Sequence, residues 1–573
     1  MKRPIKVLCS KIDIPETDIS GAKLLLDTLS EHGVSYIFAV PGREAECILF
    51  NESPNLQIVL TAIELSAGFA AYAYAIISHK TQVVFSTLGP GAANLANAIY
   101  SAYADRVAIV FITAQVERDK CYYNHTHQCI DAVKMYESIS KFAYEIGDVT
   151  EISNVIENAF QITQKEPKGP AIISIPIDVL KQKISSKISP SKLAIKKLNQ
   201  SNLYIDSIDK VVSVLQNAKQ PLVYVGNQVI RSGCVDLIRR LCETYNLPMV
   251  SAYDAKGVLP TNHELNYFAC TSYAQGILGI NADEIIFSPV DCVIAFGYDW
   301  KDDVFPDKHF SYGIEKTLIG FSSIMPEKIR SQFLDIPGNL KENLITLLHK
   351  LAKQNLSFRK PYNITSLKET IKRKQANLEA PQGLINIISV INAINETSAL
   401  LISDVGTFRH YAVLFSNTEK PNFFLTSAGS SSFGTGLPLG LGTCLAYRED
   451  ETKIIVLTGD GGFNSVIGDL RTLKNLNLSI VIIVLNNNKN GLINIYQQKG
   501  HGQTYSPSVN HAEASFVKIA EGYNCKAFKV DSNEELKNSI KKAFQIGGPV
   551  VIEVPIYYPE EDIERLTCSA DLA

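Results

Sequence analysis

The chain has 573 residues, more than a single hydrophobic core usually supports, so its length predicts about three or four domains. Its 55 lysines and arginines nearly balance its 58 aspartates and glutamates, and this balance argues against a partner that is nucleic acid or an anionic membrane surface. The sequence starts without a signal-peptide core, no stretch approaches a membrane span, and its 11 cysteines lack zinc-type spacing. We therefore expect a cytoplasmic protein with reduced thiols that acts on small molecules.

The first third of the sequence alternates helical patterns with short apolar runs. Residues 20–33 form an amphipathic pattern that ends at Gly33. Buried strands are predicted at 34–40, 56–62, 82–87, 108–115 and 171–178. This alternation predicts an α/β domain with a mainly parallel sheet covered by helices. The polar, lysine-rich stretch that follows is broken by Pro190 and is typical of a solvated linker.

The same alternation recurs twice more along the chain. Further strands are predicted at 221–226, 247–254, 290–299, 316–322, 399–406, 453–462, 478–487 and 549–556. We therefore predict three α/β domains of related fold, at residues 1–182, 200–355 and 380–573, each with a mainly parallel sheet covered by helices.

The strongest chemical signal is a pair of polar strand ends in the last domain. One predicted strand ends at Gly459-Asp460-Gly461 and the next ends at Asn486-Asn487. The interval between them fits one crossover helix and the second strand, which would bring both ends to the same carboxyl edge of a parallel sheet. Mg²⁺ prefers oxygen ligands, so Asp460, the Asn487 amide and a nearby main-chain carbonyl are suitable donors. Either half alone is more often an ordinary turn, whereas the pair is specific.

This pairing resembles the cofactor motif of thiamine-diphosphate enzymes. With the segments described below, the chain resembles the acetolactate-synthase/pyruvate-oxidase superfamily over essentially its whole length. The resemblance implies thiamine diphosphate and Mg²⁺ as cofactors, with Asp460, Asn487 and the main chain of Lys489 as metal ligands. Further cofactor contacts are expected at Pro41, Gly42, Glu64, Asn94, Gly406, Thr407, Ser431, Phe433, Gly459, Gly461, Gly462 and Gly491. It also implies a homodimer or homotetramer whose active sites lie at a dimer interface.

Glu64 stands where the resemblance demands an activating glutamate, at the start of a helix that follows a strand. That helix is otherwise alanine-rich and apolar, so its carboxyl would be largely desolvated, which favours a neutral, proton-donating form. Such a group would hydrogen-bond the aminopyrimidine of the cofactor and promote its activation. In isolation Glu64 would equally well stabilise the helix dipole, and the family context favours the catalytic role.

Three glycine- or proline-containing segments complete the resemblance. Val40 to Glu44 and Ser86 to Arg106 match family segments in order and position. Gly429 to Gly442 resembles the segment that supports the bent cofactor, with Phe433 at the wedge position. A dinucleotide-type phosphate loop is the competing interpretation, which Pro438 and the glycine spacing weaken.

Several positions depart from the acetolactate-synthase pattern. Ile63 replaces a common histidine, Thr126 to Cys129 replace an aromatic-Gln-Glu motif, and Gly406 to His410 replace Gly-Gln-His-Gln. The predicted pocket is therefore more polar and basic, which suits a substrate that carries phosphate and needs proton transfers.

These departures, with residues 255–267, 312–316 and 404–415, resemble the N2-(2-carboxyethyl)arginine synthase group, known from clavulanic-acid-type biosynthesis. That resemblance implies transfer of a three-carbon unit from D-glyceraldehyde 3-phosphate to the amino group of L-arginine through an acryloyl-cofactor intermediate, with release of phosphate. Within this scheme Arg409 is a candidate phosphate clamp, His127 and His410 are general acid–base candidates, Gln128 would orient an intermediate oxygen, and Tyr273 is a further candidate.

Two other interpretations stay open from the sequence. One is an acetolactate-synthase-like carboligase or 2-oxo-acid decarboxylase that uses pyruvate, including a flavin-containing form. The other is a catalytically inactive cofactor-binding paralogue, against which the retention of Glu64, Asp460 and Asn487 argues. Residues 225–233 offer a turn after a strand but no clear phosphate motif, so nucleotide binding by the central domain also stays open.

Overall fold

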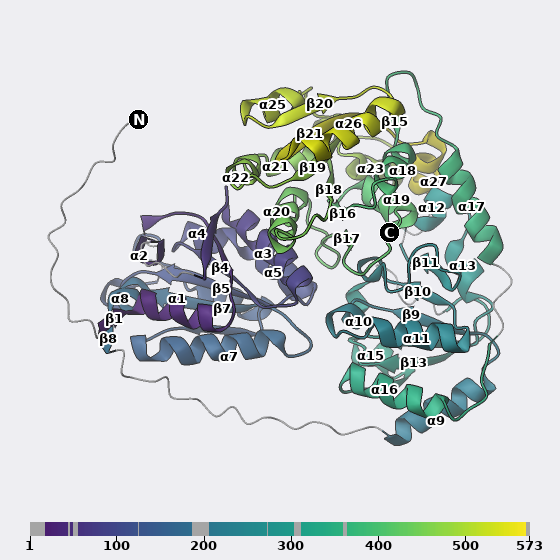
Figure 1. Cartoon of the computed structure of the whole chain (residues 1–573), viewed down its shortest axis with the longest axis horizontal. Helices are drawn as coiled ribbons and strands as arrows, with labels where there is room; N and C mark the ends of the chain where they lie inside the picture. The colour runs from purple at the N-terminus through teal and green to yellow at the C-terminus, as the bar shows by residue number, and fades with distance from the viewer. Residues whose placement is uncertain are drawn as a thin grey trace.

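The computed structural model describes residues 18–43, 46–49, 55–123, 125–185, 205–271, 273–302, 311–358 and 364–568. They form three large sheets flanked by helices, and the N-terminal unit lies beside the C-terminal unit, with the central unit below the latter (Figure 1). The linker expected around Pro190 and the predicted segment residue Glu44 lie outside the described residues. Within the described ranges, no helix is long and apolar enough to cross a membrane.

The N-terminal unit is a six-stranded parallel sheet in the order β3-β2-β4-β5-β7-β6. Its strands are β2 (Tyr36–Ala39), β3 (Gln57–Leu60), β4 (Gln82–Ser86), β5 (Ile109–Gln115), β6 (Phe142–Glu145) and β7 (Ala171–Pro176). Its helices are α1 (Gly21–Glu31), α2 (Glu46–Leu49), α3 (Glu64–Ser78), α4 (Pro90–Asn94), α5 (Ala96–Ala104), α6 (Ala132–Tyr136), α7 (Ile152–Gln164) and α8 (Ile177–Lys181). Helices α1 and α7 bury apolar side chains against one face of the sheet, and α3 and α5 do so against the other.

Local sequence explains these elements. The side chain of Ser20 caps α1 by accepting a hydrogen bond from the Lys23 N–H at 3.2 Å, and the strands β4, β5 and β7 are buried along their full length. All five strands predicted in this third are confirmed. The structure adds β6, an edge strand that is only partly buried and so lacks a continuous apolar run.

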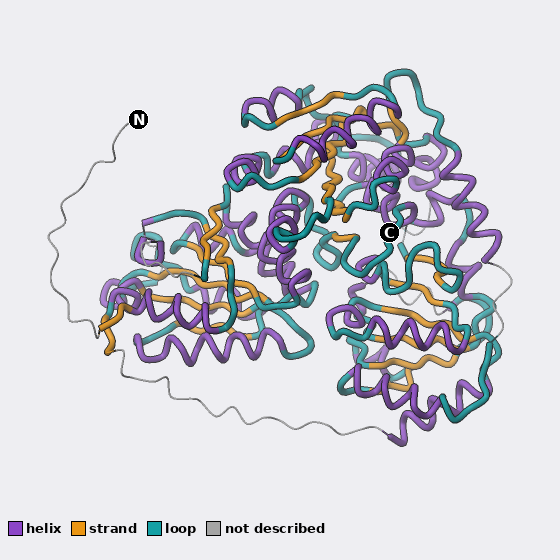
Figure 2. The backbone as a smooth tube through the Cα atoms, in the orientation of Figure 1, coloured by secondary structure: helices purple, strands orange, loops and turns teal. Residues whose placement is uncertain are grey.

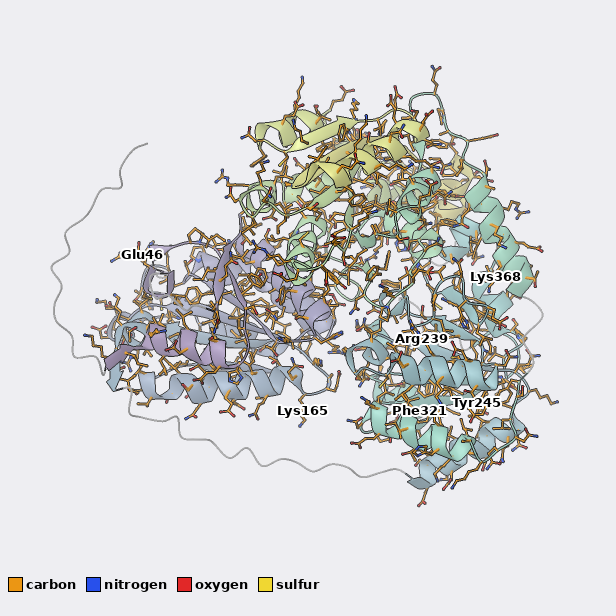
Figure 3. All side chains as sticks on the ribbon, in the orientation of Figure 1. Glu46, Lys165, Arg239, Tyr245, Phe321 and Lys368 are labelled. Atoms are coloured by element: carbon orange, nitrogen blue, oxygen red, sulfur yellow. The ribbon has the colours of Figure 1, made fainter. Side chains whose placement is uncertain are left out.

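The central unit is a second six-stranded parallel sheet, in the order β11-β10-β9-β12-β13-β14. Its strands are β9 (Pro221–Val225), β10 (Met249–Ser251), β11 (Asn266–Ala269), β12 (Cys292–Phe296), β13 (Thr317–Phe321) and β14 (Phe333–Ile336). The helices of this part of the chain are α9 (Ile205–Asn217), α10 (Gln228–Arg231), α11 (Val235–Tyr245), α12 (Ala274–Leu278), α13 (Ala282–Phe287), α15 (Glu327–Arg330), α16 (Leu340–Leu351) and α17 (Ile364–Ala376). Figure 3 shows Arg239 and Tyr245 on α11 beside this sheet, in which the side chain of Phe321 is fully buried.

The C-terminal unit is a seven-stranded parallel sheet in the order β15-β21-β19-β18-β16-β17, with β20 paired to β21. Its strands are β15 (Ile385–Asn386), β16 (Leu400–Ser403), β17 (Phe424–Leu425), β18 (Ile454–Gly459), β19 (Ile480–Asn486), β20 (Lys526–Lys529) and β21 (Pro549–Tyr557). Its helices are α18 (Ile387–Asn395), α19 (Thr407–Phe415), α20 (Gly436–Ala446), α21 (Asp460–Ser465), α22 (Asp469–Asn475), α23 (Gly491–His501), α24 (Ser506–Val509), α25 (Phe516–Gly522), α26 (Asn533–Ile546) and α27 (Glu560–Cys568).

One detail of this unit differs from the prediction. The sequence predicts one helix in the connection from β18 to β19, and the structure has two short ones, α21 and α22. The break lies at Val466 to Gly468, where a Cβ on Gly468 would stand 3.0 Å from the Cβ of Ala62 in the N-terminal unit. The break between α21 and α22 therefore coincides with a close approach to the N-terminal unit. The local sequence pattern gives no signal of that approach.

Helices α3 and α20 join the N-terminal and C-terminal units, as the tube drawing in Figure 2 makes visible. A Cβ on Gly442 of α20 would lie 2.0 Å from the carbonyl oxygen of Ala70 on α3, so only glycine permits this approach. Apolar side chains of both helices belong to one buried cluster. The three α/β folds are confirmed. The limits 1–182, 200–355 and 380–573 stay a prediction, and the short strand β8 (Lys183–Ser185), paired antiparallel with β1 (Asp18–Ser20), lies just past the first limit.

Candidate active site

The two polar strand ends lie side by side at the carboxyl edge of the C-terminal sheet. Strands β18 and β19 are parallel neighbours, with Gly459 opposite Leu485, so Asp460 and Asn486 follow at the same level. Helix α21 begins at Asp460, whose Oδ1 accepts a hydrogen bond from the Gly461 N–H at 2.8 Å. The position predicted for this motif is therefore confirmed, because adjacent parallel strands end at one edge.

The chemistry of this edge fits a divalent cation. Asp460 is only 7% exposed, and its Oδ2 has no hydrogen-bond partner among the described residues. Burial raises the pKa of the Asp460 carboxyl, against the opposing effect of the Gly461 N–H, so a positive charge at Oδ2 would compensate its buried anion. The described ranges contain no group of three or more His, Cys, Asp or Glu side chains that could hold a metal ion. One carboxylate with an amide and a carbonyl is a ligand type that suits Mg²⁺.

Three helices begin around the same edge. Strands β19, β18 and β16 are consecutive in the sheet, and α23, α21 and α19 start at or soon after their ends. A Cβ on Gly491, the first residue of α23, would lie 3.4 Å from Thr407 Oγ1 and 4.0 Å from Asn487 Nδ2. Thr407 Oγ1 is buried and, within the described part of the chain, has no partner. Converging helix N-termini with an available hydroxyl form a cradle that suits a diphosphate.

Arg409 and His410 lie on the first turns of α19 and are both 5% exposed. Arg409 Nη1 donates to the Ser427 carbonyl and to Ser431 Oγ, each at 3.2 Å. His410 Nδ1 is hydrogen-bonded to Thr271 Oγ1 at 3.0 Å. Arg409 Nε and His410 Nε2 are buried and find no partner among the residues the structure describes.

Tyr273 from the central unit packs on His410. Their rings stack with centroids 3.6 Å apart, and the Tyr273 hydroxyl lies 2.7 Å from the Tyr496 hydroxyl of α23. Burial, and then the charge of Arg409, lower the pKa of His410 well below its usual value. The imidazole is therefore neutral at pH 7. The structure thus places Tyr273 against His410, the neighbour of Arg409, and their catalytic roles stay a prediction.

A lysine holds the far end of α19. Lys256 Nζ donates to the carbonyl oxygens of Val413 at 2.6 Å and Ser416 at 3.0 Å, so an ammonium from the central unit meets the last carbonyls of this helix. Burial lowers the pKa of Lys256 to about 7. Lys256 lies in the segment 255–267 that carries the family resemblance, but the sequence predicts no role for it, because its partners lie more than 150 residues further along the chain.

The start of the segment predicted to support the cofactor, Gly429 to Gly442, lies against helix α5 of the N-terminal unit. Three hydrogen bonds hold it there: Asn97 Nδ2 to Ser432 Oγ at 2.7 Å, Ser101 Oγ with Ser430 Oγ at 2.7 Å, and the Gly429 N–H to Asp105 Oδ1 at 2.5 Å. The N-terminal donors and acceptors recur every four residues, which places them on one helical face. Sequence reasoning missed these roles, although that spacing is visible. Phe433 itself is 60% exposed.

Glu64 lies at the carboxyl edge of the N-terminal sheet. It is the first residue of α3, is 7% exposed, and its Oε2 accepts a hydrogen bond from Asn94 Nδ2 at 3.0 Å. A Cβ on Gly91 would lie 3.2 Å from Glu64 Oε1. Pro41 and Gly42 follow β2 at the same edge. The structure therefore groups Glu64 with Asn94 and the β2 turn.

His127 and Gln128 are exposed on the loop between β5 and α6. Gln128 has a left-handed backbone with φ of 58°, and its carbonyl oxygen would lie 2.8 Å from a Cβ on Gly89. Among the described residues, no hydrogen bond or ion pair joins His127 or Gln128 to Arg409 or His410. The single chain thus carries two groups of predicted site residues, one in the N-terminal unit and one in the C-terminal unit, which Tyr273 joins from the central unit.

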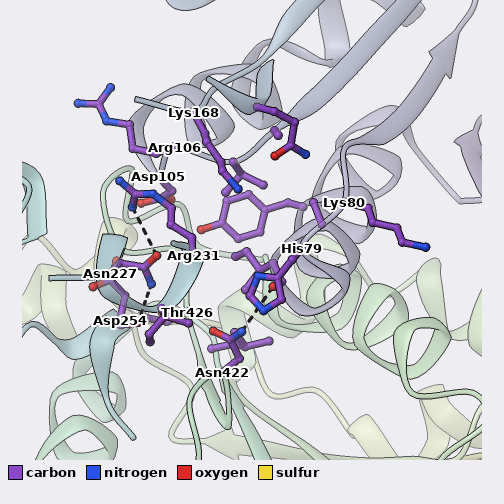
Figure 4. A pocket seen from close by; sticks show the side chains of 18 of the residues that line it. His79, Lys80, Asp105, Arg106, Lys168, Asn227, Arg231, Asp254, Asn422 and Thr426 are labelled. Atoms are coloured by element: carbon purple, nitrogen blue, oxygen red, sulfur yellow. Dashed lines mark hydrogen bonds between the residues drawn. The ribbon is translucent and has the colours of Figure 1, made fainter. Parts of the chain in front are cut away.

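A pocket at the junction of the three units lies among charged side chains (Figure 4). Its charges are largely compensated: Arg231 pairs with Glu166 at 3.0 Å, and Lys301 lies 3.3 Å from both Asp105 and Asp254. We therefore interpret this pocket as part of the docking between units.

The fold and the site together define the class, an α/β enzyme built to hold a diphosphate cofactor. Three family models match: the N-terminal TPP binding domain (residues 19–135), the central domain (208–347) and the C-terminal TPP binding domain (404–554) of thiamine pyrophosphate enzymes. The chain is 26% identical over 551 residues to the acetolactate synthase of Bacillus subtilis, covering 94% of each protein. It is 28% identical over 557 residues to the acetolactate synthase large subunit of Porphyra purpurea, covering 94% of this chain and 92% of that protein. The chain belongs to the acetolactate-synthase/pyruvate-oxidase superfamily of thiamine-diphosphate enzymes.

Proposed function

We propose that this thiamine-diphosphate enzyme is a synthase that also uses Mg²⁺ and joins a three-carbon unit from D-glyceraldehyde 3-phosphate to the α-amino group of L-arginine. The products would be N2-(2-carboxyethyl)-L-arginine and phosphate. The aldehyde carbon becomes the carboxylate carbon, the neighbouring carbon loses its hydroxyl, and the new C–N bond replaces the C–O bond to phosphate. This exchange balances without an external oxidant.

The observation that carries this proposal is the pair of available nitrogens on α19. Arg409 Nε and His410 Nε2 are buried without partners among the described residues, beside the available hydroxyl of Thr407. A buried guanidinium suits a phosphate group, and a neutral imidazole at pH 7 suits proton transfer. The usual acetolactate-synthase motif at these positions, Gly-Gln-His-Gln, offers no arginine.

Each residue has a defined task under this proposal. Asp460, Asn487 and the main-chain carbonyl of Lys489 would hold Mg²⁺. Thr407, Gly461 and Gly491, in the first turns of α19, α21 and α23, would hold the diphosphate. Thiamine diphosphate, when bound, supplies a carbon nucleophile and an electron sink. Arg409 would bind the substrate phosphate through Nε, while its Nη atoms stay fixed by Ser427 and Ser431.

Three further side chains are assigned to proton transfer under this proposal. His410, stacked on Tyr273 and bonded to Thr271, would exchange a proton at Nε2. Glu64 would exchange a proton with the aminopyrimidine of the cofactor, and His127 would act at the substrate. We further propose a cytoplasmic homodimer or homotetramer in which Glu64 and His127 of one subunit complete the site of another.

A pyruvate-using carboligase is the second candidate. The two relatives named above are 26% and 28% identical to this chain, and the matches cover 94% and 92% of their length. Both carry the name acetolactate synthase, which favours the pyruvate-using candidate. Both candidates share the cofactor and differ in the first substrate.

One assay separates the two candidates. The purified protein is incubated with thiamine diphosphate, Mg²⁺, D-glyceraldehyde 3-phosphate and a panel of amino acids, and released phosphate and product mass are measured. Phosphate release with a carboxyethyl-arginine mass is expected. An adduct of another amino acid would keep the reaction and change the acceptor. Consumption of pyruvate without phosphate release would overturn the proposal in favour of the carboligase, and flavin bands in the absorption spectrum would point to its flavin-containing form.

A further inference from the structure

Helix α22 of the C-terminal unit contacts the turn that presents Glu64. Asp469, the first residue of α22, has a fully buried side chain. Its Oδ2 accepts a hydrogen bond from Ser66 Oγ at 2.5 Å, and its Oδ1 accepts one from the Ala62 N–H at 3.4 Å. One turn further on, Thr472 Oγ1 donates to the Leu60 carbonyl oxygen at 3.2 Å. Asp469 therefore bonds on both sides of Glu64 in sequence.

The start of α3 lacks a cap of its own. The residue at its N-cap is Ile63, which has no side-chain hydrogen bond to the helix. Such a position normally carries Ser, Thr, Asp or Asn, whose oxygen accepts an N–H of the first turn. A carboxylate near the helix start also interacts favourably with the helix dipole. Asp469 supplies the carboxylate from another unit: it bonds the Ala62 N–H just before the helix and the Ser66 hydroxyl in its first turn, so the conformation of this turn depends on a tertiary contact.

The segment that contains Asp469 begins at the sheet edge where the diphosphate is predicted to bind. Helix α21 begins at Asp460, and Gly468, next to Asp469, lies against Ala62 at the break between α21 and α22. The strand-to-helix turn that carries Glu64 is therefore seated on the segment that begins at the predicted metal ligand. The hydrogen bonds described for the Asp469 side chain go to Ala62 and Ser66, and none of them goes to Asp460 or Asn487.

We propose that Asp469 is a positioning residue that fixes the direction of the Glu64 side chain by bonding Ala62 and Ser66 across the unit boundary. The inference rests on the proposed role of Glu64. It assigns to α22 a task in cofactor activation that is separate from cofactor binding. Burial raises the pKa of Asp469 to about 6, and the two hydrogen bonds oppose that shift.

The test isolates the activation step. The rate at which the C2 proton of bound thiamine diphosphate exchanges for deuterium is measured by quenched-flow NMR, beside the Kd for the cofactor. In D469A this rate should fall on the order of 10- to 100-fold, because small misplacements of a catalytic group have effects of that size. The Kd should change by less than about threefold, since Asp460, Asn487 and Gly491 are untouched. D469N should restore most of the rate, because its amide can accept from Ala62 and donate to Ser66.

Three further variants make the outcome decisive. S66A removes one of the two bonds and should slow exchange in the same direction, which keeps the idea testable if D469A does not fold. R448A removes an exposed contact of Arg448 with Gln57 between the same two units and should leave exchange unchanged. E64Q should abolish exchange. If E64Q does so while folded D469A and S66A exchange at the wild-type rate, the positioning role is wrong and the role of Glu64 stands. If E64Q also exchanges normally, the proposed function of Glu64 fails first.

Discussion

At the residue scale, the site is marked by buried polar atoms that are available to a ligand. Asp460 Oδ2, Thr407 Oγ1, Arg409 Nε and His410 Nε2 are such atoms in the C-terminal unit, within the described part of the chain. An unsatisfied buried polar group costs about 1–3 kcal/mol, so a fold retains several of them together where a ligand compensates that cost. The sequence named these four residues, but which of their atoms are buried without a partner is a property of the folded chain.

The ionisation of Asp469 predicts a pH dependence of stability. Its folded pKa of about 6 exceeds the ordinary 3.8, so between about pH 4 and 6 the folded state binds more protons than the unfolded state. Stability from this group is therefore present at low pH and is lost as pH rises through about 6. Asparagine stays neutral, so from pH 4 to pH 7 the unfolding free energy of D469N should gain about 2 kcal/mol relative to wild type.

Urea unfolding of both proteins at a series of pH values checks this. A difference between them that is the same at pH 4 and pH 7 would show that Asp469 does not carry the raised pKa. S66A, which keeps the carboxylate, is the matched control and should not gain stability with rising pH relative to wild type.

At the scale of elements, helix α5 holds the loop that ends at Phe433. Removal of the Asn97 side chain by N97A deletes the bond to Ser432, the residue next to Phe433. A lost hydrogen bond of this kind costs about 1 kcal/mol, so the Kd for thiamine diphosphate should rise about fivefold if the loop supports the cofactor. Isothermal titration of the Mg²⁺-containing protein measures this.

The control lies on the same helix. Tyr100 is 47% exposed, so Y100A should leave the Kd unchanged. Equal Kd values for N97A, Y100A and wild type would separate the loop from cofactor binding and leave α5 with a purely structural role. Strands are the elements that the sequence predicts most directly, because continuous apolar runs such as those of β5 and β19 mark strands buried on both faces.

At the scale of the whole molecule, the proposed site needs two subunits. The Glu64 group and the Asp460 group lie in different units of one chain, and we predict that a second chain brings them together. Mixing inactive E64Q and D460A subunits should then restore activity, because one site of each mixed dimer combines an intact Glu64 with an intact Asp460. Random pairing would make about a quarter of all sites intact.

The measurement is specific activity after the two variants are dissociated and reassociated together. Each variant reassociated alone is the control and should stay inactive. No recovery in a mixture shown to contain mixed dimers would place both groups of each site within one chain and overturn the shared-site proposal.

The sequence by itself determined the three α/β units, most of their strands and the pairing of Asp460 with Asn487. These depend on local periodicity and on the rule that neighbouring parallel strands end at one edge, both of which can be read from residue order. Only the tertiary structure decided that Asp469 bonds the Glu64 turn, that Lys256 meets the end of α19, and that α5 holds the Phe433 loop. Each of these contacts joins residues more than 150 positions apart. Such contacts arise from how helices pack between units, and no local pattern encodes that packing.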